Sequence, residues 1–500
     1  MINKLFAFLI VSTVLYSSTL HLATSANPSR LNPLIATDSA SSEIAGHIFN
    51  SLVKYDDNLS HIVGDLAKKF YFENNTTLIF ELRKNVLWQD GEKFGAKDVL
   101  FTYNTLMSKE LISPYSSSFR FIKSVEILDE HKLKVTYKEP YFKALQTWMM
   151  GIIPYHILKD EKNLMNSSFN THPIGTGSYK LTQLQHSKDI ILEANQHYFE
   201  GTPKIEKIVY HIIPDSTTRF LMLKSQLLDV GSLDSMSYER KLTQEFVKNF
   251  NIFEKPTLSY TYLGFNLRKK KFQNPKVRQA LSLAINRQEL IDILFFKHAK
   301  VCSGPFLPNT PAFNKEVKVP QQNLLKAKQL LEESGYNETH PFEFEIATSN
   351  SNAIRPYAAQ ILQQQLQKVG VKVTLRIMEW QAFLNTVVFP YKFDTILLGW
   401  GLSPTPDPYM FWHSDNDKVG GFNLVGYHNK AMDVLIEKSQ KITDEKQLSL
   451  MFQKMFSMVV KDNPYLFLYI PNSITAINKK IKNVSTTPSG IWHNYIKWEK

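Results

Sequence analysis

The sequence predicts an α/β protein with two lobes that face each other across a cleft. Three observations support this fold class. The chain has 500 residues, which is too long for a single hydrophobic core. Strand and helix patterns alternate over residues 342–400, and a shorter alternation of the same kind covers residues 205–230. Two such units, separated in the sequence, predict two separate lobes.

The unit at 342–400 contains three predicted strands, at 342–346, 371–377 and 394–400. Between them, a helical apolar stripe ends at Gly370, and a second predicted helix begins at Trp380. Strands joined by helices in this way are expected to pair in parallel.

The earlier unit begins with a predicted strand at 205–213. Asp215 is the expected cap of a helix that runs to about residue 226, and a second strand follows at 228–230. Farther along the chain, Asn274 before Pro275 predicts another helix start, and Asn286 predicts the next one.

Residues 78–137 show a different pattern. Residues 78–82 alternate as a strand, and residues 97–107 predict a helix. Two further alternating runs flank a turn at 129–131, which predicts a hairpin. We therefore expect a separate, hairpin-rich region in this part of the chain.

Polar and aromatic residues follow the predicted strands. In open α/β sheets, ligands bind beyond the carboxyl ends of the strands. In the later unit those ends carry Ser349–Ser351, Glu379–Trp380 and Gly399–Gly401, and in the earlier unit Asp215–Ser216 and Gly231–Ser232. Aromatic side chains there are either walls of a ligand pocket or parts of the core, and Trp412 is expected in the core.

The N-terminus resembles a secretory signal. Lys4 precedes an apolar run at 5–15, and small polar residues follow at 17–19. The predicted signal peptide covers residues 1–18, with cleavage near Ser17 or Ser18, and the alternative is a buried first element. No cysteine follows the apolar run, so no lipid anchor of that kind is expected.

The composition argues against several other classes. The formal net charge is +12, but the basic residues are scattered, whereas a nucleic-acid binder would concentrate them. The single cysteine, Cys302, allows no disulfide within the chain and no cysteine-based metal site.

No catalytic motif emerges. Gly175-Thr176-Gly177 lacks the Lys and Ser/Thr of a phosphate loop, and the sequence contains no metalloprotease or nucleophile-elbow motif. His413 and His428 flank a glycine pair and are either metal ligands or, as we favour, ordinary loop histidines. We therefore expect no enzyme, no cofactor and no metal site. An exported hydrolase and a binder that serves no permease are the alternatives from other classes.

Several segments, in order along the chain, resemble the family 5 extracellular solute-binding proteins, which serve peptide and nickel ABC importers. They are Asn32-Pro33-Leu34 with 37–42, 82–86 with Asp90-Gly91 and 96–99, the segment 173–179, the helix pair 277–280 and 284–287, and Ala327, Leu330, Leu331 and Gly335-Tyr336. The resemblance covers nearly the whole chain.

The resemblance implies a periplasmic-binding-protein-like clamshell of the large, three-domain type II form. The first lobe would comprise residues 19–49, 169–265 and 473–500. An additional mixed α+β domain would occupy 50–168 and pack on the first lobe, and the second lobe would occupy 266–472. The chain would then cross between the lobes twice.

The implied function is that of the substrate-binding component of an ABC importer. Such a protein captures di- to oligopeptides in the periplasm and delivers them to the permease with its ATPase, and it is expected to be a monomer without nucleic-acid partners. The alternative is a binder of a nickel or other metal chelate.

The resemblance also implies a ligand site shared by the two lobes. Dipeptide binders of the family hold the ligand's amine with an Asp soon after a Gly-Trp pair, and no acid lies that close to Gly399-Trp400 here. Asp407 or Asp38 is a candidate amine anchor.

Nickel-chelate binders of the family use arginines to hold the carboxylates of the chelator, and residues 148–155 contain no arginine. Arg120 and Arg355 are either anion contacts or surface salt bridges. The expected ligand-binding residues are Thr37, Asp38, Ser39, Ala40, Trp380, Gly399, Trp400, Gly401, Leu402, Ser403 and Asp407.

Overall fold

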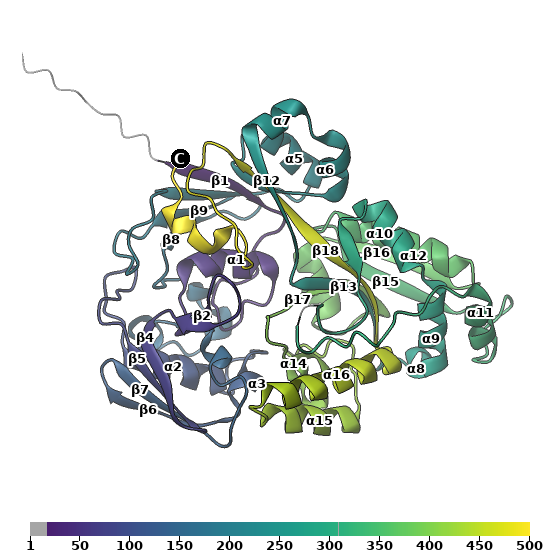
Figure 1. Ribbon diagram of the computed structural model, residues 1–500, viewed down its shortest axis with the longest axis horizontal. Helices are drawn as coiled ribbons and strands as arrows, with labels where there is room; N and C mark the ends of the chain where they lie inside the picture. The colour runs from purple at the N-terminus through teal and green to yellow at the C-terminus, as the bar shows by residue number, and fades with distance from the viewer. Residues whose placement is uncertain (1–17, 309) are drawn as a thin grey trace, which may run out of the picture.

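The computed structural model describes residues 18–308 and 310–500, and within them it has two lobes with an additional domain on the first (Figure 1). The predicted signal peptide, apart from Ser18, lies outside the described residues. Across the described part of the chain, no helix combines the length and apolar character that a membrane span requires.

The first lobe is built on a four-stranded sheet in the order β1 (Thr19–Thr24), β10 (Lys207–Ile212), β9 (Asp189–Ala194) and β8 (Tyr179–Leu184). Strand β1 runs parallel to β10, and the other pairs are antiparallel. Helix α1 (Ser39–Ile48) follows the first strand. The predicted strand, helix and strand are present as β10, α5 (Ser216–Lys224) and β11 (Val230–Leu233), but β11 belongs to another sheet, where it pairs with β18 (Tyr465–Asn478). The remaining elements of this lobe are α6 (Ser235–Lys241), α7 (Gln244–Asn249) and β12 (Phe250–Pro256).

The additional domain contains an antiparallel sheet in the order β4 (Ala67–Asn74), β5 (Thr77–Leu82), β7 (Lys132–Tyr137) and β6 (Ile122–Asp129). The predicted hairpin is the pair β6 and β7, and the predicted helix is α2 (Ala96–Met107). Smaller elements complete the domain: β2 (Val53–Tyr55), β3 (Ile62–Gly64), α3 (Ser116–Phe119) and α4 (Tyr155–Leu158).

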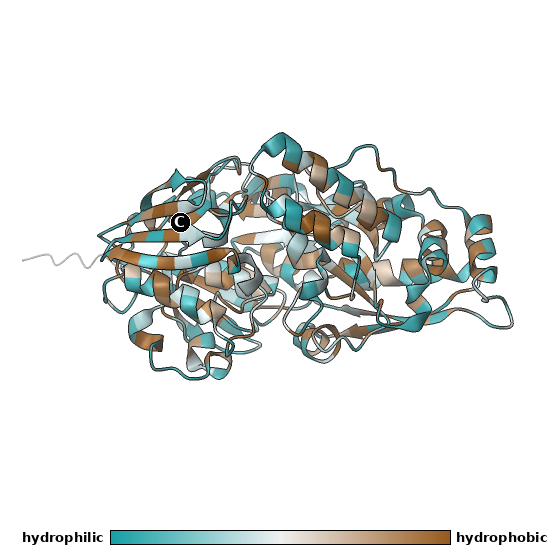
Figure 2. Ribbon diagram, turned by 90° about the horizontal axis from the view of Figure 1, so that it is seen from below, coloured by the Kyte–Doolittle hydropathy of each residue, from teal (hydrophilic) through white to brown (hydrophobic). Residues whose placement is uncertain are grey.

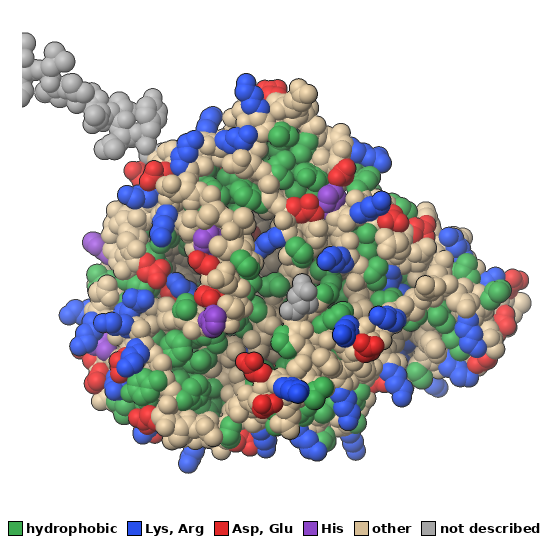
Figure 3. Space-filling model, in the orientation of Figure 1, with side chains coloured by type: hydrophobic (Ala, Val, Ile, Leu, Met, Phe, Trp, Pro, Cys, Tyr) green, Lys and Arg blue, Asp and Glu red, His purple; other side chains and the backbone are tan. Residues whose placement is uncertain are grey.

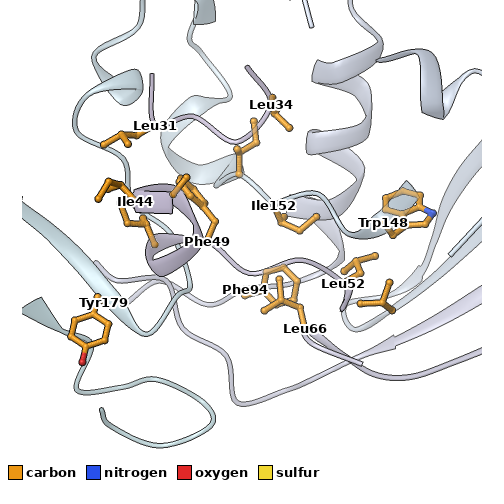
Figure 4. Close-up of a cluster of buried hydrophobic side chains, with 14 of the residues drawn as sticks. Leu31, Leu34, Ile44, Phe49, Leu52, Leu66, Phe94, Trp148, Ile152 and Tyr179 are labelled. Carbon is orange, nitrogen blue, oxygen red and sulfur yellow. The ribbon is translucent and has the colours of Figure 1, made fainter. Parts of the chain in front are cut away.

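One continuous hydrophobic core joins the additional domain to the first lobe. Figure 4 shows side chains of this core from both parts, including Ile44 on α1 and Trp148 of the additional domain. Both residues are at most 1% exposed. The additional domain is therefore packed on the first lobe through its core rather than tethered to it.

The second lobe contains the predicted run of parallel strands, β15 (Glu343–Ser349), β16 (Lys372–Met378) and β17 (Thr395–Gly401), with β15 in the middle. Helix α12 (Ile354–Gln367) connects the first two strands, and α13 (Trp380–Phe383) continues as a wider helical turn at 384–388. The expected β-α-β-α-β pattern is thus confirmed.

Other helices surround the sheet of the second lobe. The predicted starts are confirmed, since the Asn274 and Asn286 side chains accept hydrogen bonds from the backbone N–H groups of Lys276 and Glu289. Figure 2 shows apolar and polar residues alternating along the helices and strands, as burial of one face requires. The remaining elements are α8 (Lys270–Gln273), α9 (Pro275–Ala284), α10 (Arg287–Phe295), β14 (Ala299–Val301), α11 (Leu324–Glu332), α14 (Pro408–Trp412), α15 (Lys430–Gln440) and α16 (Glu445–Asp462).

Two chain segments connect the lobes side by side. Strand β18 (Tyr465–Asn478) pairs with β13 (Ser259–Phe265) in the second lobe and with β11 and β12 in the first. The Thr257 hydroxyl donates to the Pro471 carbonyl oxygen at 2.8 Å, which joins the two crossing segments. Strand β13, which the predicted bounds assign to the first lobe, pairs with β17 of the second lobe. The domain bounds remain a prediction.

Candidate ligand-binding cleft

A cavity of about 980 Å³ lies between the lobes, and all eleven predicted ligand-binding residues line it. The first lobe contributes residues 37–40 at the start of α1, and the second lobe contributes Trp380, residues 399–403 and Asp407. The predicted convergence of the strand ends on one site is thus present in the structure. Contact of these residues with a ligand remains a prediction.

Asp38 is used by its own chain. Its carboxylate caps α1 by accepting from the Ser41 N–H at 3.0 Å and from the Ser41 hydroxyl at 2.6 Å, and the Ser29 hydroxyl also donates to it. A carboxylate with three such donors is committed to the helix terminus. Asp38 therefore holds α1 in place at the edge of the cavity, and it is a poor candidate for the amine anchor.

The end of β17 brings aromatic side chains to the cavity. Trp400 lies 4.8 Å from Phe411 and 5.3 Å from Phe422, measured between ring centroids. Its indole N–H donates to the Tyr465 hydroxyl at 3.3 Å. Trp412 is 1% exposed and packs in the core, as predicted. Aromatic walls with few polar groups are typical of small-ligand pockets.

At the start of α13, Trp380 lines both the main cavity and an adjoining pocket of about 550 Å³. The neighbouring Gln381 donates from its side-chain amide to the Asn27 carbonyl oxygen of the first lobe at 3.0 Å. The lobes are therefore in direct contact beside this pocket.

Near Asp407, the additional domain contacts the second lobe. The Lys143 ammonium lies 2.8 Å from an Asp407 carboxylate oxygen, and the Tyr55 hydroxyl donates to the Thr405 hydroxyl at 2.9 Å. Arg120 donates to the Gln440 side chain at 2.6 Å and lies over the Tyr409 ring. The surface salt bridge that was one interpretation of Arg120 is therefore wrong, because this guanidinium instead bonds a neutral amide across the interface.

Arg355 lines the cavity without a counter-ion. Among the described residues, no carboxylate forms an ion pair with its guanidinium, and its buried Nε has no hydrogen-bond partner. Burial lowers the pKa of Arg355 because it penalises the charged form. The surface salt bridge considered for this residue is therefore wrong as well, and an anion contact remains.

Besides Arg355, which was considered only as an anion contact, four charged residues of the cavity were not among the predicted site residues, namely Glu43, Lys143, Arg219 and Asp234. Glu43 could have been found, because it lies four residues after Ser39 on the same helix and so shares its face. Arg219 could have been found in the same way, because it lies three residues after Ser216 on α5. Lys143 lies far in sequence from every strand end of the two predicted α/β units, and no local pattern points to it.

Comparison with known proteins gives the family. The model of the bacterial extracellular solute-binding proteins, family 5, matches residues 61–422. The oligopeptide-binding protein AppA of Bacillus subtilis is 31% identical over 489 residues, which cover 94% of this chain and 89% of AppA. This chain belongs to the family 5 extracellular solute-binding proteins.

Solved structures of this family share the architecture. The B. subtilis AppA structure, in complex with a nonapeptide, has a TM-score of 0.91 at 30% identity and covers 96% of this chain and 98% of that chain. NikZ of Campylobacter jejuni, in complex with Ni(L-His), has a TM-score of 0.87 at 27% identity and covers 97% of this chain and 100% of that chain. DppA of Helicobacter pylori, in complex with the peptide STSA, has a TM-score of 0.88 at 26% identity and covers 96% and 98% of the two chains. The predicted clamshell fold is confirmed.

Family 5 members are binding proteins, so the expectation that the chain is no enzyme is confirmed. The lone thiol fits this role, because burial raises the pKa of Cys302 to about 12 and its S–H donates to the Gly304 carbonyl oxygen at 3.3 Å. His428 lies 2.7 Å from Asp417, and His413 is buried. Within the described ranges, no group of three or more His, Cys, Asp or Glu side chains could hold a metal ion.

Proposed function

We propose that this chain is the substrate-binding component of an ABC importer and that its ligand is a peptide. The observation that carries the proposal is the cavity of about 980 Å³, lined from both lobes. Its volume lies near the upper end of the range of about 300–1,000 Å³ for small-molecule sites, which favours a ligand larger than one amino acid. The likeness to AppA and DppA supports a peptide in particular.

The residues of the cavity suggest how a peptide is held. The ends of β15 and β17 offer backbone groups, aromatic rings such as that of Trp400 offer apolar contact, and Arg355 offers an unpaired positive charge to a carboxylate. A ligand that contacts both lobes favours the closed arrangement by its differential affinity for the two states. Rotation at the crossing segments Thr257 and Pro471 would open the cleft.

We further propose that the chain is exported by a cleaved signal peptide, acts in the periplasm as a monomer, and docks on a permease that works with an ATPase. The scattered surface charge agrees with a freely diffusing protein, and Figure 3 shows basic and acidic side chains interspersed on one face. Native mass spectrometry of the purified periplasmic protein would report its mass and its oligomeric state together. An intact N-terminus or a stable dimer would contradict this part of the proposal.

The same measurement identifies the ligand. We expect a series of retained peptide masses, and addition of a peptide mixture should extend it. The alternative function is capture of a nickel or other metal chelate, which the unpaired Arg355 would also suit because chelators carry carboxylates. A mass shift that requires nickel plus histidine, with no peptide retained, would replace the peptide proposal by this alternative.

A further inference from the structure

Four carboxylates line the main cavity, and three of them are occupied by their own chain. Asp38 caps α1, and Asp407 forms an ion pair with Lys143 at 2.8 Å. Asp234 caps α6 by accepting from the N–H and the hydroxyl of Ser237, each at 2.8 Å. The fourth carboxylate is that of Glu43, and its surroundings differ from those of the other three.

Glu43 lies on α1 at the junction of two cavities. Its side chain is solvent-accessible and lines both the main cavity and a side cavity of about 200 Å³ between the C-terminal segment and β12. In the described part of the chain, no lysine, arginine or histidine lies within 4.0 Å of this carboxylate. It therefore faces the cleft without a counter-charge.

The polar groups around Glu43 do not supply that charge. It faces the hydroxyl of Tyr210, which also contacts Nε2 of His47 at 2.9 Å. Burial lowers the pKa of His47 to about 4, so this ring is neutral at neutral pH. Lys255 lines the side cavity, but its ammonium donates to the Pro488 carbonyl oxygen at 3.3 Å. Glu43 is open to the cavity, but the surrounding protein replaces much of the bulk water near its carboxyl, and this desolvation raises the pKa of Glu43 to about 7.

We propose that Glu43 is a subsite for a cationic nitrogen of the ligand, so that the receptor selects peptides that place an ammonium group at this junction. The inference rests on the proposed function and adds a selectivity to it. An ammonium donates charge-assisted hydrogen bonds to a carboxylate, and in an enclosed cleft such bonds are stronger than in bulk water. Glu43 on the first lobe and Arg355 on the second then place charges of opposite sign in the cleft, neither of them in an ion pair.

Two ligand groups have this chemistry, the amino terminus of a peptide and the side chain of a lysine. The side cavity beside Glu43 leaves space for a side chain, whereas an amino terminus needs only the main cavity. Asp407 was the competing candidate from the sequence, and its pairing with Lys143 makes it less available. Peptides that differ only in these groups separate the two sources.

The experiment is a competition followed by native mass spectrometry on the full-length mature protein. Alanine peptides of about two to nine residues are mixed in three forms: with a free amino terminus, N-acetylated, and N-acetylated with one lysine. We expect wild type to retain at least one of the two cationic forms about tenfold more than the acetylated lysine-free form. The variant Glu43→Gln should lose this preference while still binding the acetylated form.

Asp234→Asn is the matched control, because it removes one negative charge from the same cavity and Asn still caps a helix. It should keep the wild-type preference, which excludes a general effect of cavity charge.

A measurement of proton release on binding gives an independent readout. Binding of a cationic peptide at about pH 6.5 should release a proton in wild type and not in Glu43→Gln, because the ligand favours the ionised carboxyl. Calorimetry in two buffers of different ionisation enthalpy detects this proton.

The outcomes separate the inference from the proposed function. If peptides bind but Glu43→Gln keeps the wild-type preference, the cation subsite is wrong and peptide binding stands. If Asp234→Asn loses the preference equally, the effect is one of total charge, and the subsite is again wrong. If no peptide of any form or length is retained, both the proposed function and the subsite are wrong.

Discussion

The ammonium nitrogen of Lys143 lies 2.8 Å from a carboxylate oxygen of Asp407, and each side chain is only 10% exposed. Lys143 belongs to the additional domain, and Asp407 lies at the start of α14 in the second lobe. The pair therefore connects two parts of the molecule that would separate if the cleft opened. Removing either partner of an ion pair with so little exposure destabilises the closed arrangement, because the remaining charge stays desolvated and has no counter-charge.

Replacing Lys143 with methionine distinguishes two roles of Asp407. If the pair stabilises the closed state, Lys143→Met should weaken binding of a retained peptide about tenfold, because closure then leaves a carboxylate unpaired. If Asp407 instead anchors the ligand's amine, the same change frees it and strengthens binding. We expect the first result in calorimetric titrations. Glu193→Gln, which breaks the exposed pair of Lys207 and Glu193, should leave the affinity unchanged.

Replacing Arg355 with methionine should change stability and binding in opposite directions. The empty protein no longer carries an unpaired, desolvated guanidinium in its cleft, so its thermal midpoint should stay the same or rise by a few degrees. Affinity for a peptide with a free carboxyl terminus should fall about tenfold or more. A matched measurement with a C-terminally amidated peptide should show a much smaller loss. A lower midpoint together with unchanged affinity would contradict the anion-contact role.

Close packing against the end of α1 accounts for the glycines of the motif Gly175-Thr176-Gly177. A Cβ at Gly175 would lie 1.9 Å from the Ile48 carbonyl oxygen at the end of α1, and that oxygen also accepts from the Gly177 N–H at 2.7 Å. We expect Gly175→Ala to destabilise the protein by roughly 1–3 kcal/mol, because the backbone must move. Gly46→Ala, on α1 itself, has no atom within 4 Å of its Cβ and should stabilise by about 0.5–1 kcal/mol. Thermal unfolding of both variants checks the contrast.

His298 should make stability depend on pH. Its ring contacts Glu239 at 2.7 Å and Glu254 at 2.8 Å, so a residue next to β14 meets two carboxylates of the first lobe. Burial alone would lower the pKa of His298, but these two partners outweigh it and raise the pKa above the usual value. A raised pKa means that the stabilisation is present below about pH 6.5 and is lost as the pH rises through the folded-state pKa.

The variant His298→Gln removes this dependence. The difference in thermal midpoint between wild type and the variant should be larger at about pH 6 than at about pH 9, because only the protonated ring gains from the two carboxylates. An equal difference at both values would mean that the contacts act as neutral hydrogen bonds. The exposed pair of His61 and Asp56 offers a control, and His61→Gln should have little effect at either pH.

Local periodicity was sufficient to predict much of the fold. The run from β15 to β17 was recognised because each strand and helix carries its own apolar pattern, and the parallel pairing follows from the connecting helices. The bound at residue 265 came from the family resemblance and from no local pattern. The pairing of β13 with β17 depends on tertiary structure, so the sequence of this segment alone does not indicate it.

The cleft was predicted where a strand end or a family motif pointed to it. All predicted residues line the cavity, but the sequence did not distinguish those that are free from those that are occupied. The carboxylate of Asp38 is taken by Ser29 and Ser41, and that of Asp407 by a lysine distant in sequence. Pairings of this kind depend on tertiary structure, so no local pattern contains them.

Strand β18 restricts where insertions and deletions can occur during the evolution of this chain. Its fourteen residues, Tyr465–Asn478, set the register of the second lobe at one end and of the first lobe at the other. Loss or gain of a single residue near Pro471 would turn every following side chain to the opposite face of its sheet. Insertions and deletions are therefore expected to accumulate in the loops of family relatives and to be absent from this strand, which gives any sequence alignment a fixed point.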